Sequence, residues 1–107
     1  MVVNIYKDSF DVYIERRGKG HDGYFGNPVA VGQPCPVCGK THQKGETLRC
    51  YERHLRVRVV VEPEFRARLL ALKGQTLGCF CAPAGGFRPG DPEICHGQVI
   101  ERWLSER

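Results

Sequence analysis

Hydrophobic and polar residues change their spacing along the chain, and each change marks an expected element. Near the N-terminus, β-branched residues dominate 2–6 (VVNIY), and apolar residues alternate with others over 10–14 (FDVYI). Both patterns are typical of short strands. A third strand is expected over 76–81 (TLGCFC). Alternation with a period of two would place the sulfurs of Cys79 and Cys81 on the same face of this strand.

Three stretches show helical spacing instead. The first covers about 48–57 with Thr47 as a candidate cap, the second begins at Pro63 and ends near residue 73, and the third covers about 94–106. Their apolar faces are Leu48, Tyr51 and Leu55, then Phe65, Leu69 and Leu72, then Val99, Ile100, Trp103 and Leu104. The three valines at 59–61 fit either a longer first helix or a short strand.

The order of these elements predicts the fold class. Two strands, two helices, a strand and a final helix predict a small α/β or α+β domain with a single-layer sheet covered by helices. The 107 residues suit one domain over 1–107, and 41% hydrophobic and 26% charged residues are ordinary for a globular protein. A core of this size is modest, so a bound metal would add usefully to stability.

Charge and targeting signals limit the function only weakly. The net charge of +4 permits nucleic acid as a partner but does not argue for it, because a basic solvated surface is the more common explanation. The sequence has neither an apolar run of membrane-spanning length nor the layout of a signal peptide. We therefore expect a cytoplasmic protein whose six cysteines are ligands, catalytic groups or buried thiols. Export by another route would instead favour three disulfides.

The segment 33–45 differs in character from its surroundings and reads as an insertion. It contains Cys35-Pro-Val-Cys38-Gly followed by His42. Glycine after the second cysteine allows a turn that directs backbone N–H groups at thiolates, as in a zinc knuckle. A redox Cys-x-x-Cys would rather open a helix, which these prolines and glycines do not suit. His42 is the third expected zinc ligand and Cys50 the fourth, although Cys50 also fits a buried thiol.

A second candidate site consists of Cys79, Cys81, Cys95 and His96. Three thiols and an imidazole make a complete tetrahedral zinc set. The same groups also suit a reactive site, with His96 as acid or base and a cysteine, such as Cys95, as nucleophile or zinc ligand. Buried core thiols are a third interpretation. A zinc ribbon that pairs Cys35 and Cys38 with Cys79 and Cys81 also stays open.

A loop over 16–26 carries four glycines and three basic residues, Arg16, Arg17 and Lys19. Backbone N–H groups and cations together can hold an anion, so these residues, with Asn27 and Arg88, are the candidate ligand-binding set. The alternative is an ordinary surface loop. His21 and His54 are weaker candidates for metal ligands.

Four segments resemble one family in the same order and over nearly the whole chain: VVNIYKDSFDVYIERRGKG, GNP, LKGQTLGCFCAP and CHGQVIERWL. This family is DUF4326, an uncharacterised family of bacteria and phages, and the resemblance implies a small α/β fold without implying an activity. The residues that match its pattern are Tyr13, Arg16 or Arg17, Gly26, Asn27, Pro28, Cys79, Cys81, Pro83, Cys95, His96 and Gly97.

Three residues depart from the family pattern. Glu15 replaces a glycine, Phe25 stands where tryptophan is common, and Gln98 replaces an acid after Cys-His-Gly. If that acid is a base or ligand in the family, this chain has lost it. The knuckle around Cys35 is an addition to the family plan, which supports a separate structural metal site.

These observations lead to three functional hypotheses. The first is a zinc-binding domain that binds a nucleotide or nucleic acid in the cytoplasm, which is the host cytoplasm if the chain is phage-encoded. The second is a small nucleotide-processing enzyme, a hydrolase or transferase, that uses the second cysteine cluster. The third is an interaction module that docks on a host protein. A catalytic zinc keeps one open position and a structural zinc is closed by four protein ligands, so the ligand count discriminates between the first two.

Overall fold

A three-stranded parallel sheet forms the centre of the computed structural model, which describes residues 1–15, 20, 22–43 and 46–107. The strands are β1 (Val2–Asn4), β2 (Val12–Tyr13) and β3 (Leu77–Cys79), in the order β1-β3-β2. Leu77 pairs with both Val2 and Val12. The strand that comes last in the sequence is therefore central, and its carboxyl end lies between the ends of its neighbours. The predicted α/β architecture is confirmed.

The strands are shorter than their sequence patterns suggested, and Asn4 explains where β1 stops. Its side-chain oxygen accepts a hydrogen bond from the backbone N–H of Tyr6 at 2.9 Å. Its backbone carbonyl accepts further bonds from the N–H groups of Lys7 and Asp8. An asparagine that binds the backbone two residues on starts a turn, so the chain leaves the sheet before the apolar run ends.

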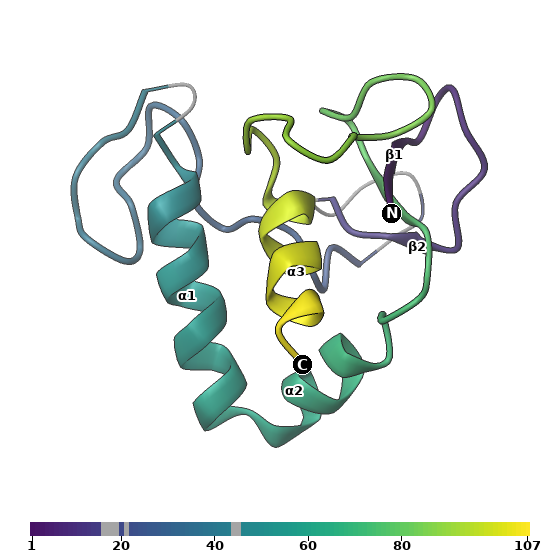
Figure 1. Cartoon of the computed structure of the whole chain (residues 1–107). Helices are drawn as coiled ribbons and strands as arrows, with labels where there is room; N and C mark the ends of the chain where they lie inside the picture. Colours follow the sequence, from purple (N-terminus) through teal and green to yellow (C-terminus); the bar gives the residue numbers. More distant parts are fainter. Residues whose placement is uncertain (16–19, 21, 44–45) are drawn as a thin grey trace.

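The helices are α1 (Leu48–Val61), α2 (Pro63–Leu70) and α3 (His96–Ser105), of which α3 packs directly on the sheet. Helix α3 contacts both α1 and the strands β1 and β3, so it lies between α1 and the sheet, as Figure 1 shows. Helix α2 packs against α1 and begins with the predicted proline in its first turn. None of the helices in the described part of the chain combines the length and apolar character needed to cross a membrane.

The three valines at 59–61 belong to helix α1, which resolves the ambiguity of their sequence pattern. Tyr51 and Leu55 are buried, and Val59 packs partly buried against the same core. The spacing of four continues one apolar stripe along the helix, which outweighs the strand preference of β-branched residues. Val60 lies off this stripe and is 80% exposed.

The main core lies where α3 meets the sheet, and Gly97 allows this close approach. A Cβ atom at Gly97 would lie 2.7 Å from Cδ1 of Ile14 and 3.0 Å from Cγ1 of Val2. Both neighbours are almost completely buried, so neither has room to move away. The first turn of α3 is thus fixed tightly against the carboxyl end of β2.

The described part of the insertion, residues 33–43, lies at the N-terminal end of α1 and away from the sheet (Figure 1). Short bridges join Val31 with His42 and Pro34 with Thr41. Its buried hydrophobic cluster is small and consists of Val29, Cys35 and Cys50, with Val37 packed against it. This region therefore buries little apolar surface of its own, and two of the three buried members are thiols.

Candidate metal centres

Four predicted ligands meet at the insertion: Cys35, Cys38, His42 and Cys50, here called the knuckle cluster. Their ligand atoms all lie within 4.8 Å of one another. Nε2 of His42 is 3.3 Å from Sγ of Cys38 and 3.4 Å from Sγ of Cys50. The fourth ligand comes from the first turn of α1, so the cluster joins the insertion to this helix. Such a set could hold a metal ion.

The local sequence builds this cluster through a tight turn. The backbone N–H of Gly39 donates to the carbonyl of Cys35 at 2.8 Å, and the N–H of Cys35 donates to the carbonyl of Lys40. Gly39 has a φ of +78°, a conformation that residues with a Cβ rarely adopt. The N–H of Val37 points at Sγ of Cys35, 3.3 Å away. This is the turn that the glycine after the second cysteine predicted.

The thiols of the knuckle cluster differ in acidity. Burial by itself would raise the pKa of Cys35, but hydrogen bonds from the backbone of Cys38 and Val37, aided by His42 and Cys50, lower it to about 6. Burial and the neighbouring thiols of Cys35 and Cys38 raise the pKa of Cys50 to about 11. One thiol of the cluster therefore ionises readily. Ionisation of a second thiol is opposed by the first thiolate unless a cation offsets their repulsion.

The second group of cysteines assembles at the carboxyl end of β3. Sγ of Cys95 lies 3.0 Å from Sγ of Cys79. Ligand atoms of Cys81, Cys95 and Glu15 all lie within 4.8 Å of one another, and these three are here called the pocket cluster. Its members come from the end of β2, the segment after β3 and the start of α3. Glu15 was noted in the sequence only as a departure from the family pattern.

Crowding sets the acidity of these thiols. The interaction with Cys81, opposed by that with Cys95, is the main reason that the pKa of Cys79 is raised to about 11. Interactions with Cys79 and Cys81, followed by burial, raise the pKa of Cys95 well above its usual range. Both thiols therefore lose their protons less readily than a free cysteine.

Cys95 caps helix α3. Its sulfur accepts a hydrogen bond from the N–H of Gly97 at 3.4 Å, and the side chain of Gln98 accepts from the N–H of Cys95 at 3.0 Å. This reciprocal arrangement is a capping box. Gln98 therefore has a positioning role at the start of α3, and a carboxylate could accept the same hydrogen bond.

His96 lines the same pocket as Cys81 and Cys95 but stands outside the pocket cluster. Its Nε2 lies 2.6 Å from the carbonyl oxygen of Ile14, and since a carbonyl only accepts, this nitrogen carries the hydrogen. The ring meets Tyr51 edge to face, with centroids 5.1 Å apart. Among the described residues, no metal-ligand group includes His96, whose Nε2 hydrogen bond joins the start of α3 to the end of β2.

A pocket of about 280 Å³ opens over the pocket cluster. It is lined by Glu15, Asn27, Thr47, Leu48, Phe80, Cys81, Ile94, Cys95 and His96. The side chain of Asn4 donates to the carbonyls of Phe80 and Ala82 at 3.2 and 2.9 Å and so holds the segment that carries Cys81. Sequence reasoning missed Asn4, although a polar residue inside an apolar strand was a usable signal.

The structure separates the two cysteine groups, so the zinc-ribbon pairing of Cys35 and Cys38 with Cys79 and Cys81 is not formed. All six cysteines are described, and none forms a disulfide. His54 lies on α1 outside both clusters.

Only some of the predicted anion-binding residues belong to the part of the chain that the structure describes. Arg16, Arg17, Lys19 and His21 lie outside the described residues. Asn27 is buried, and its side chain accepts from the N–H of Val29 at 2.8 Å while also lining the pocket. Arg88 lines a different pocket beside the last helix, together with Gln98 and Arg102. The structure thus does not bring Arg88 to the cysteines.

Comparisons with known proteins add a family and no activity. Comparison with curated proteins gave no match, and neither did comparison with solved structures. The model of one family, described as "Domain of unknown function (DUF4326)", matches residues 3–106. That match spans the strands, the helices and both cysteine clusters, and so it confirms the resemblance seen in the sequence: the chain belongs to the DUF4326 family.

Proposed function

We propose that this protein binds zinc at the knuckle cluster and that the ion has a structural role. The observation that carries the proposal is the convergence of three sulfurs and one imidazole nitrogen within 4.8 Å. Three cysteines and a histidine are a common ligand set for structural zinc. Thiolate and imidazole donors also favour zinc over magnesium or calcium, which prefer oxygen.

The weakness of the surrounding core supports a structural role. The insertion buries little apolar surface besides Val29 and its own thiols. With Cys50 on helix α1, a bound ion would fix the insertion to the N-terminal turn of that helix. Four protein ligands would leave no coordination position for a substrate.

We further propose that the surface beside the knuckle binds a phosphate-bearing partner, either a nucleotide or single-stranded nucleic acid. A pocket of about 660 Å³ is lined by Lys40, Arg49 and Arg53 as well as by ligands of the knuckle cluster. Among the described residues, none of these three cations has a salt bridge. Lysine and arginine side chains of this kind suit phosphate oxygens.

The acidic residues at this pocket already have partners. Glu46 accepts a hydrogen bond from the backbone N–H of Gln43 at 2.7 Å, and Glu93 pairs with Arg102 at 2.7 Å. The pocket therefore keeps an excess of positive charge toward solvent. Arg49 and Arg53 are four residues apart on α1 and share one helix face.

Metal analysis and a binding titration test these proposals. Elemental analysis should find zinc, and Cys38→Ser should lose the equivalent held by the knuckle. Fluorescence anisotropy should show binding of a labelled single-stranded oligonucleotide, and a separate titration with ATP tests the nucleotide. The Arg49→Ala/Arg53→Ala variant should weaken this binding at least tenfold. The control is Arg66→Ala, which removes an exposed arginine from α2. Equal losses in both variants would mean nonspecific charge attraction and would overturn the proposed partner.

A second candidate function is a small enzyme, and the pocket over Cys81 and Cys95 favours it. The pocket combines two thiols, a carboxylate and the side chain of Asn27 in one concave site. Such a collection of nucleophilic and metal-ligating groups is typical of active sites. The number of protein ligands on any metal bound there separates this function from a second structural site.

A further inference from the structure

We infer that Glu15, Cys81 and Cys95 form a second metal centre that keeps an open coordination position toward the pocket above it. The inference deepens the second candidate function and does not depend on the knuckle. It differs from the ligand set that the sequence indicated, because Glu15 replaces His96 and Cys79 stands outside the set of ligands.

The donor atoms are already gathered. A carboxylate oxygen of Glu15 and the sulfurs of Cys81 and Cys95 lie within 4.8 Å of one another. Zinc binds thiolates at about 2.3 Å and carboxylate oxygens at about 2.0–2.2 Å, so one ion between these atoms reaches all three with small side-chain adjustments. The three come from separate elements, and the capping of α3 holds Cys95 in place.

The environment of Glu15 calls for a cation. This side chain is only 8% exposed. One carboxylate oxygen accepts a hydrogen bond from the N–H of Phe80 at 3.2 Å, and no cationic side chain in the described part of the chain pairs with it. A carboxylate in such a place is stabilised by a charge partner. A divalent ion between the three donor atoms would be that partner.

Two neighbours that sequence reasoning placed in this site have other roles. His96 lies outside the group of donor atoms and donates its Nε2 hydrogen to the carbonyl of Ile14. Cys79 is fully buried in β3, does not line the pocket, and contacts Cys95 sulfur to sulfur at 3.0 Å. We therefore assign Cys79 as a hydrogen-bonding neighbour of a ligand sulfur, a position that tunes the metal without binding it.

Three protein ligands leave a tetrahedral ion with one free position, as in catalytic zinc sites. All three ligands line the pocket of about 280 Å³, and Asn27 and Thr47 add polar groups to its wall. The open position would take a water molecule or a small anion. The knuckle cluster, with four ligands, offers no such position.

The test uses cobalt(II) as a coloured substitute for zinc, elemental analysis, and azide as a small anionic probe. The wild-type chain should hold two metal ions. Cys38→Ser should keep only the ion at the pocket cluster, and Cys95→Ser only the ion at the knuckle. Azide should change the cobalt absorption spectrum of Cys38→Ser and leave that of Cys95→Ser unchanged.

Two further variants test the ligand assignment. Glu15→Gln keeps the size of the side chain and removes its charge, and it should weaken metal binding at the pocket at least tenfold. Cys79→Ser should retain the ion and shift only its cobalt–thiolate absorption band. Far-UV circular dichroism checks that each variant is folded.

Several results would overturn the inference. One is a wild-type chain that holds a single metal ion which Cys38→Ser removes. Others are a Glu15→Gln variant with unchanged metal affinity at the pocket and a Cys79→Ser variant that loses the ion there. The last is a cobalt spectrum of Cys38→Ser that does not change with azide. Failure of the knuckle proposal would give a different result, because Cys38→Ser would then hold as much metal as the wild type.

Discussion

The two cysteine clusters use similar ligands in opposite settings. The knuckle cluster takes three of its four ligands from eight consecutive residues, 35–42, and stands on a small apolar cluster of its own. The pocket cluster takes one ligand from each of three elements and lies against the main core. In the knuckle, the metal would replace a missing core. In the pocket, the core is already present, and it holds donors around an open space.

The same contrast appears in how each cluster is held together. Gly39 turns the backbone so that three of the four knuckle side chains meet within one loop, and Cys50 joins them from the adjacent first turn of α1. At the pocket, Gly97 lets α3 approach the sheet, and hydrogen bonds from Asn4 and His96 fix the flanking segments. A local device thus builds one cluster, and long-range packing builds the other. Mutations should separate these two dependencies.

The largest effect is expected from Cys35→Ser, which removes a buried thiol of the knuckle cluster and thus one ligand of the proposed zinc ion. Structural zinc contributes about 10–16 kcal/mol to the folding of small zinc domains, so the insertion should lose its fixed structure. Amide hydrogen exchange should become fast over 29–43 and stay slow in α3. The control is Pro36→Ala, which alters the same loop without removing a ligand. Unchanged protection in Cys35→Ser would show that the insertion does not need the metal.

Gly97→Ala tests the packing beneath the pocket cluster. The new methyl group would clash with Ile14 and Val2, and overpacking of a core costs about 1–3 kcal/mol, more than alanine gains in helix propensity. Urea unfolding should therefore show a lower midpoint. Metal binding at the pocket cluster should weaken, and metal binding at the knuckle cluster should stay unchanged. Ser105→Ala, at the exposed end of the same helix, should stay within about 0.5 kcal/mol of the wild type. Equal stability of Gly97→Ala would contradict the close packing described here.

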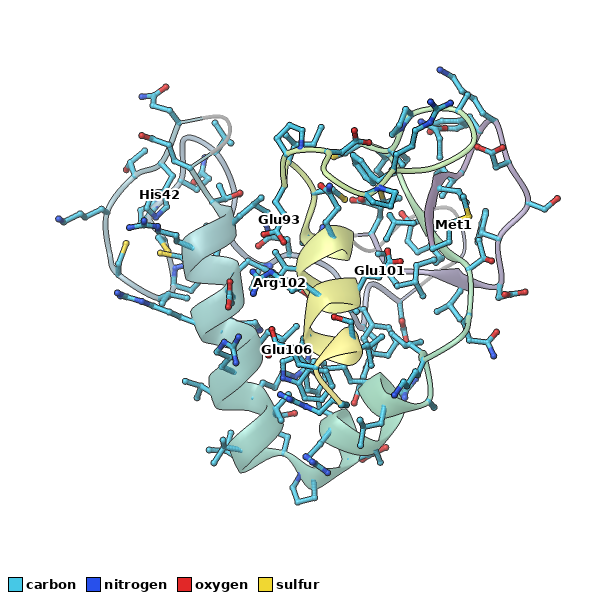
Figure 2. The ribbon with its side chains drawn as sticks, in the orientation of Figure 1. Met1, His42, Glu93, Glu101, Arg102 and Glu106 are labelled. Atoms are coloured by element: carbon cyan, nitrogen blue, oxygen red, sulfur yellow. The ribbon has the colours of Figure 1, made fainter. Side chains whose placement is uncertain are left out.

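A smaller effect is expected at the contact between α1 and α3, the helices that carry Cys50 and Cys95. Arg102 donates to both carboxylate oxygens of Glu52 and also pairs with Glu93, and Figure 2 shows Arg102 and Glu93 between the two helices. The Arg102 guanidinium holds the pKa of Glu52 below its usual value. Glu52→Gln should therefore cost about 1 kcal/mol at neutral pH.

The pH dependence of this contribution follows from the direction of the shift. A carboxyl whose pKa is lowered by folding stabilises the native state at every pH above its unfolded pKa, and the contribution is lost as the pH falls through the lower folded pKa. The difference in unfolding free energy between wild type and Glu52→Gln should thus be constant near pH 7 and shrink in acid. The exposed Glu64→Gln on α2 should show no such difference. A gap that widens in acid would contradict the pairing.

The smallest effects concern the far end of α1, remote from both clusters. Val60→Ala should change stability by less than about 0.5 kcal/mol or raise it slightly, because Val60 is 80% exposed and alanine favours helices. Val59→Ala should cost about 1 kcal/mol, since Val59 packs against the core. Thermal unfolding of the pair measures this. A larger loss at Val60 than at Val59 would indicate that these residues are not helical.

Sequence patterns predicted the elements of the fold well, because each pattern acts over a few residues. The stripes of α2 and α3 and the proline at the start of α2 were all visible in the chain. Strand ends were predicted less well, since the turn at Asn4 depends on its side chain and outweighs the apolar run. The valines were ambiguous until Val59 could be seen to reach the core.

The sequence by itself determined the knuckle and the family. Spacing brings Cys35, Cys38 and His42 together within one loop, so local geometry made three of the four members predictable, and Cys50 follows closely in the next helix. Only the tertiary structure decided the membership of the second cluster. It turns His96 toward Ile14 and brings Glu15 to Cys81 and Cys95. The physical reason is that side chains far apart in the chain meet according to how α3 packs on the parallel sheet, and residue spacing carries no record of that packing.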